Sequence, residues 1–190
     1  MSPRTAIAST CSAVAEALYG PLPADLSGPT PCTGFDLAGL VEHAVGTTGA
    51  MARLGAGRPL DPDNPWGGGS AEGDWGAALR RNLDAISEGW SNEERWQGTI
   101  RAGGSEMPAA TIGEMALVEV AVHGWDLARA LNRDLSVPDD VATDILSAVE
   151  PTAELGRQMG AYGPAVPPPD DASPFERALA ATGRDPRWQG

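Results

Sequence analysis

The sequence predicts an all-α protein: a four-helix bundle with a long crossover between helices two and three, followed by an accessory C-terminal helix and an extended tail. Three observations support this class. Four long segments carry apolar residues at helical spacing, the connection over 55–73 is long and rich in Gly and Pro, and strand-forming runs are nearly absent. We expect one domain over 1–190, with the bundle in 1–135 and the accessory helix and tail in 136–190.

The first two helices are predicted over 4–18 and 36–54. The first repeats apolar residues on one face: Ile7, Cys11, Val14 and Leu18. A loop rich in Pro and Gly separates the two helices, and either Thr33 or Asp36 can cap the second one. Because the 55–73 connection need not form a hairpin, it can cross the bundle and leave helices two and three parallel.

The next two helices are predicted over 74–90 and 111–131. The third helix carries its large apolar residues on one side: Trp75, Leu79, Leu83, Ile86 and Trp90. Between these helices, residues 95–109 contain Gly103-Gly104 and are typical of a small hairpin or an extended loop.

A fifth helix is predicted over 138–158, with Pro138 in its first turn and an interruption at Pro151. The tail then reads as extended and ends in a short helix. Ser173 and Glu176 have the spacing of a capping box, and Gly183 is a typical helix stop.

The charge balance excludes some partner classes. The formal net charge is −13, all 13 basic residues are Arg, and no basic stripe is present. This argues against nucleic acid and against anionic membrane surfaces, and no apolar run reaches the roughly 20 residues of a membrane helix. We therefore expect a cytoplasmic protein with a small-molecule partner, and leave a homodimer open. Cys11 and Cys32 lack metal-ligand spacing and are interpreted as reduced thiols; a disulfide or a reactive Cys32 is less favoured.

The predicted fourth helix carries two polar residues on its inward face. Glu119 and His123 are four residues apart, so they lie one turn from each other, where burial without partners is costly. His43, the only other histidine, lies on an inward stripe of the second helix. Two imidazoles and one carboxylate on facing helices form a three-ligand site that suits catalytic zinc or non-haem iron. The ordinary alternative is a buried ion pair with a hydrogen-bonded core histidine.

Asp126 follows His123 by three residues. It can accept a hydrogen bond from an imidazole N–H, as partners of metal-bound histidines do, or act as a base. A hydrogen bond to a neighbouring loop is an equally good explanation.

Two segments resemble a known family. TPCTGFDLAGLVEHAVG and the later ExxxHGWDLARAL resemble the DinB-like metal-binding superfamily, in the branch that contains the N-terminal domain of mycothiol-dependent maleylpyruvate isomerase. The tail VPPPDDASPFERALAATGRDPRW resembles the end of small single-domain members. The resemblance implies a divalent metal, most often zinc, with nickel or iron as alternatives, held by His43, Glu119 and His123. It also implies a low-molecular-weight thiol such as mycothiol as co-substrate.

The expected function is a metal-dependent thiol transferase or isomerase acting on a small electrophile, because metal coordination deprotonates a thiol. The related isomerase has a second, C-terminal domain with a functional Arg, for which 190 residues leave no room. Two alternatives remain at this stage. One is a hydrolase that uses a metal-bound water, with Asp126 as its candidate base, and the other is a non-catalytic metal- or ligand-binding protein.

Overall fold

The structure is a computed structural model that describes residues 2–66 and 68–190. The described chain is mostly helical, as predicted, with one small two-stranded sheet. Its elements in order are α1 (Pro3–Ala17), α2 (Leu37–Gly55), α3 (Trp75–Ser91), the 3₁₀ helix η1 (Glu93–Trp96), β1 (Thr99–Ala102), β2 (Ser105–Pro108), α4 (Ala109–Ala130), α5 (Asp139–Val149), α6 (Ala153–Gln158) and α7 (Pro174–Ala181).

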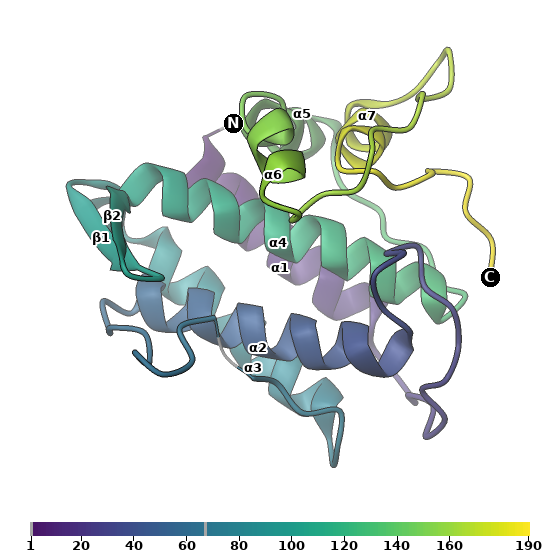
Figure 1. Ribbon diagram of the computed structural model, residues 1–190, viewed down its shortest axis with the longest axis horizontal. Coiled ribbons are helices and arrows are strands. Elements are labelled where there is room, and N and C mark those ends of the chain that lie inside the picture. Colours follow the sequence, from purple (N-terminus) through teal and green to yellow (C-terminus); the bar gives the residue numbers. More distant parts are fainter. Residues whose placement is uncertain (1, 67) are drawn as a thin grey trace.

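The four long helices pack along one another, with α2 beside α3 and α4, and α1 beside the same two helices (Figure 1). On α3, the Asn82 side-chain amide donates to the Val45 carbonyl of α2 at 3.0 Å. Closer to the C-terminal ends of both helices, the Trp90 indole N–H donates to the Met51 carbonyl at 3.1 Å. Residue numbers therefore increase in the same direction along both helices, so α2 and α3 are parallel. The chain that joins them, described over 56–66 and 68–74, therefore returns along the length of these helices (Figure 1).

The helix boundaries follow local signals in the sequence. Asp36 caps α2 by accepting a hydrogen bond from the Gly39 N–H at 2.8 Å, which decides between the two predicted capping residues. The predicted hairpin is present, and its turn residues Gly103 and Gly104 both have positive φ. The predicted interruption near Pro151 separates α5 from α6. Pro138 itself lies one residue before α5 rather than at its first helical position.

The C-terminal elements pack on the outer side of α1 and α4 (Figure 1). α5 contacts α1, α4 and α7. α7 begins with the predicted capping box between Ser173 and Glu176 and ends two residues before Gly183, whose φ is +86°. The tail then returns to α4, where Arg129 donates to the Trp188 carbonyl at 2.9 Å. Within the described part of the chain, no helix combines the length and apolar character that crossing a bilayer requires.

Candidate metal centre

Three of the residues singled out in the sequence meet where α2 faces α4. The Nε2 atoms of His43 and His123 are 3.2 Å apart. The Oε2 atom of Glu119 lies 3.6 Å from Nε2 of His123 and 3.9 Å from Nε2 of His43. Helical periodicity places Glu119 and His123 one turn apart on α4, and the packing of α2 on α4 supplies His43. The structure thus gathers the three predicted ligand atoms within 4.8 Å of one another.

The spacing of these atoms fits a small cation. Zinc lies about 2.0–2.2 Å from nitrogen and oxygen ligands, and tetrahedral geometry then places the ligand atoms roughly 3.4 Å apart. The three separations in the protein bracket this value. In addition, Oε2 of Glu119 is buried and accepts no hydrogen bond from any described group. A buried carboxylate oxygen without a partner is costly, and a cation between the three groups would satisfy it.

His43 has the electrostatic character of a neutral ligand. Burial lowers the pKa of its imidazole below the usual 6.5, and the neighbouring His123 lowers it further, while Glu119 acts in the opposite direction. The ring of Phe35 stacks on the His43 ring, with centroids 5.0 Å apart and an interplanar angle of 25°. This stacking restricts the orientation of His43, and no pattern in the sequence predicts it.

Asp126 lies behind His123, in the place predicted for a partner of its imidazole. The Oδ2 atom of Asp126 is 3.0 Å from Nδ1 of His123, and the Asp126 side chain is fully buried. A carboxylate can only accept, so Nδ1 of His123 donates, and in the neutral imidazole this leaves the lone pair of Nε2 toward Glu119 and His43. This is the arrangement in which metal-binding histidines are usually held.

Arg184 also contacts the candidate centre, and the sequence did not predict it. Its Nη2 atom donates to Oδ2 of Asp126 at 2.9 Å, and its side chain is almost fully buried. Burial by itself lowers the pKa of this guanidinium, but the charge and hydrogen bonds of Asp126 outweigh it and the pKa is raised. Arg184 follows Asp126 by 58 residues in a tail rich in polar residues, so no local pattern in the sequence marks it as buried.

The two cysteines are free thiols, as predicted. Burial raises the pKa of Cys11 to about 12. Burial also raises the pKa of Cys32, although Arg184 opposes the shift, so the alternative of an activated thiolate at Cys32 is not supported. Cys32 lies near His123 and Asp126 and could in principle join a metal group with them. The Arg184 guanidinium donates to its sulfur at 3.3 Å and places a positive charge there, which disfavours a second cation.

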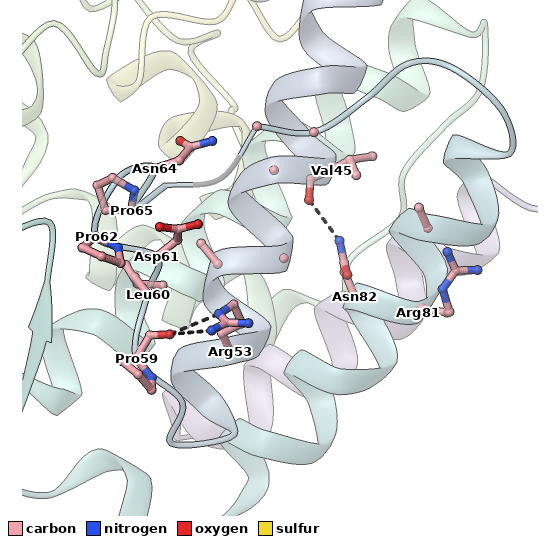
Figure 2. Close-up of a pocket in the computed structure, with 16 residues that line it drawn as sticks. Val45, Arg53, Pro59, Leu60, Asp61, Pro62, Asn64, Pro65, Arg81 and Asn82 are labelled. Carbon is pink, nitrogen blue, oxygen red and sulfur yellow. Dashed lines mark hydrogen bonds between the residues drawn. The ribbon is translucent and has the colours of Figure 1, made fainter.

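The centre opens toward solvent rather than into the protein. Behind it, Glu119 and His123 line a cavity of only about 10 Å³, too small for a ligand. The side chains of His43 and Glu119 remain 32% and 27% exposed, so a ligand must approach from their outer side. A separate pocket of about 760 Å³ lies between α2, α3 and the preceding connection (Figure 2). In this pocket, Arg53 donates two hydrogen bonds to the Pro59 carbonyl. His43, Glu119 and His123 do not line the pocket.

The fold and the centre together define a class: helical proteins in which facing helices supply two histidines and a glutamate that can hold a metal ion. The chain belongs to the family of the mycothiol maleylpyruvate isomerase N-terminal domain, within the DinB-like superfamily, and the family model matches residues 7–128. The matched range includes His43, Glu119 and His123, and it ends before Arg184.

Two proteins of Mycobacterium tuberculosis are similar over most of their length. Uncharacterized protein MT0763 of strain CDC 1551 / Oshkosh and uncharacterized protein Rv0738 of strain ATCC 25618 / H37Rv are each 28% identical over 166 residues. The alignment covers 85% of this chain and 86% of each relative. No solved structure matches the chain.

Proposed function

We propose that this protein is an enzyme that holds one divalent metal ion through His43, Glu119 and His123, and that zinc is the favoured metal. With that metal it would bind a low-molecular-weight thiol such as mycothiol, for transfer to a small electrophile or for isomerisation of one. The observation that carries the proposal is the pair of facing Nε2 atoms, 3.2 Å apart, beside a buried carboxylate oxygen that has no hydrogen-bond partner in the described part of the chain. Helices α1 to α4 would form the four-helix bundle that supports this centre.

Each residue of the proposed centre would have its own role. A bound divalent metal lowers the pKa of a coordinated thiol, so that thiolate exists at neutral pH. Asp126 holds His123 with Nε2 free, and Phe35 holds His43. The carboxylate of Glu119 offsets part of the positive charge of the metal. The partly exposed side of His43 and Glu119 leaves room for a thiol and an electrophile to approach together.

The choice of thiol chemistry over hydrolysis rests on the shortage of bases. Both histidines of the chain are placed in the centre, so no imidazole remains to activate a water. Asp126 was the candidate base, but it is fully buried and is engaged by both His123 and Arg184. The family description, which names mycothiol, supports the same choice.

The test combines metal analysis with thiol binding. Wild-type protein, His43→Ala, His123→Ala and the control Glu42→Ala would be purified, loaded with zinc and measured by elemental analysis. Glu42→Ala removes an exposed carboxylate on α2 next to His43. We expect one zinc per chain in the wild type and the control and none in the two histidine variants. Full zinc in both histidine variants would rule out this centre.

Isothermal titration with mycothiol then tests the thiol. We expect binding to the zinc-loaded wild type and to Glu42→Ala, and none to metal-free protein or His123→Ala. Zinc-loaded protein that binds no thiol would retain the metal centre and reject thiol transfer, and assays for metal-dependent hydrolysis would follow.

A further inference from the structure

Arg184 is a buried cation that the proposed chemistry does not use directly. It comes from the tail after α7, and only 4% of its surface is exposed. Its guanidinium contacts three partners: Nη2 and Nε donate to the Asp126 carboxylate, Nη1 donates to the Thr182 carbonyl at 2.9 Å, and Nη2 also donates to the Cys32 sulfur at 3.3 Å. An arginine with so few exposed atoms and so many contacts is held in one orientation.

The contacts form a continuous path to the proposed metal centre. Oδ2 of Asp126 accepts from Nη2 of Arg184 at 2.9 Å and from Nδ1 of His123 at 3.0 Å. A single carboxylate oxygen therefore joins the guanidinium to the imidazole. Because the Asp126 carboxylate is fixed by Arg184, both the plane of the His123 ring and the nitrogen that carries its proton are fixed in turn.

We propose that Arg184 is a positioning residue of the metal centre and acts through Asp126 on His123. This inference rests on the proposed metal site. The backbone of the tail supports it independently: the Arg184 N–H donates to the Leu179 carbonyl at 2.9 Å, which anchors the residue at the end of α7. The centre is thus completed by a segment that lies outside the residues 7–128 matched by the family.

Arginine suits this place better than lysine would. The planar guanidinium directs two N–H groups at one carboxylate and a third at a backbone carbonyl, whereas an ammonium group offers a single point charge. Arg184→Lys should therefore keep the charge beside Asp126 but lose part of the orientation. Arg184→Met should lose both.

The test measures metal binding under native conditions. Zinc dissociation constants would be obtained by chelator competition, and cobalt would be substituted to read the ligand geometry from its visible absorption. We expect Arg184→Met to weaken zinc binding by about 10- to 100-fold and to change the cobalt spectrum, since loss of such supporting contacts typically has this effect. Arg184→Lys should fall between Arg184→Met and the wild type.

Arg129→Met is the matched control. Arg129 lies on α4 and, like Arg184, ties the tail to this helix, but its printed partners are the Trp188 carbonyl and the Asp134 carboxylate rather than Asp126. Its zinc affinity and cobalt spectrum should equal those of the wild type. An equal loss of affinity in Arg129→Met would show that anchoring of the tail is what matters, and would overturn the positioning role.

Two further variants cover the case in which Arg184→Met fails to fold. The double variant Asp126→Asn with Arg184→Met removes both charges of this buried pair, so neither is left unpaired. Its zinc affinity should be no weaker than that of Asp126→Asn alone. In Arg184→Ala, millimolar guanidinium chloride should restore part of the affinity, while sodium chloride should not. Zinc affinity and cobalt spectrum unchanged in Arg184→Met would overturn this inference and leave the proposed function intact. A wild type that binds no metal would overturn both.

Discussion

At the residue scale, the Oε2 atom of Glu119 is buried and has no hydrogen-bond partner among the described residues. The Nε2 atoms of His123 and His43 lie 3.6 and 3.9 Å from this oxygen. Because the pKa of His43 is lowered, that imidazole is neutral near pH 7 and offers no compensating charge. A buried carboxylate oxygen without a partner is costly, so we expect Glu119 to lower the stability of the metal-free protein.

The substitution Glu119→Gln should change stability and metal binding in opposite directions. The neutral amide removes a buried charge, so we expect the metal-free variant to be at least as stable as the wild type, by up to about 1 kcal/mol. Zinc affinity should fall, because an anionic ligand is lost. Urea denaturation with and without a chelator, together with zinc titration, measures both effects. A metal-free variant that is clearly less stable would show that Glu119 has a structural partner.

The buried thiol of Cys11 makes the stability of the protein depend on pH above about 9. Burial, with a smaller contribution from Asp84, raises the pKa of its thiol from 9.0 to about 12 in the folded protein. Below pH 9 the thiol is protonated in both the folded and unfolded states, so its contribution to stability is intact. Between pH 9 and 12 only the unfolded state loses the proton, so stability falls as pH rises.

The comparison with Cys11→Ala isolates this effect from other titrating groups. The stability advantage of the wild type over the variant should be constant from pH 7 to 8.5 and should shrink from pH 9 upward, by at most about 1.4 kcal/mol per pH unit. Urea denaturation at a series of pH values measures it. An advantage that stays constant to pH 10.5 would mean that the thiol ionises equally well in the folded state.

At the scale of the elements, α2 and α3 approach each other closely near their C-terminal ends. A Cβ atom on Gly89 would lie 2.6 Å from the backbone carbon of Gly55, and a Cβ on Gly55 would lie 2.8 Å from the Trp90 ring. Both glycines are therefore needed for this packing. The same helix α2 also packs on α4, where His43 faces His123.

The substitution Gly89→Ala should destabilise the protein by about 1–3 kcal/mol through overpacking, despite the better helix propensity of alanine. Gly49→Ala is the matched control on α2. Its added Cβ would meet Asn82 at an ordinary 3.5 Å, so the gain in helix propensity should remain and stabilise the protein by up to about 1 kcal/mol. Thermal denaturation of both variants measures the difference. Effects of the same sign would contradict the close approach of α2 and α3.

The long helices and several of their boundaries could be predicted from the sequence. Apolar periodicity predicts the long helices to within two residues at each end, because one face of each must enter the core. Asp36, Ser173 and Gly183 mark boundaries through purely local hydrogen bonds and backbone conformation. His43 and His123 could be predicted as inward from the same periodicity.

The contacts that cross the fold could not be predicted in this way. Phe35 lies in a loop, and its stacking on His43 depends on the path of that loop. Arg184 resembles a surface residue of the tail until the packing of α5 and α7 brings it to α4. Such contacts depend on tertiary packing, which periodicity does not encode.

At the scale of the whole molecule, the candidate centre joins two helices that the sequence separates widely. His43 lies on α2 and Glu119 and His123 lie on α4, 80 residues apart at the histidine pair. A metal ion held by all three would link α2 to α4 only when the molecule is folded. Metal binding is then coupled to the stability of the entire chain rather than to one element.

Because of this coupling, we expect zinc to raise the free energy of unfolding of the whole protein. If only the folded protein binds zinc, free zinc at about 100 times its dissociation constant should add roughly 2.7 kcal/mol to the free energy of unfolding, and the Tm should keep rising with the logarithm of zinc concentration. His43→Ala should show no such rise, because its α2 contributes no ligand. Magnesium at the same concentration should also have little effect, since it prefers oxygen ligands to imidazole. Differential scanning fluorimetry over a zinc series, in protein first treated with a chelator, provides the measurement. A Tm that does not depend on zinc in the wild type would mean that the three side chains meet without binding a metal.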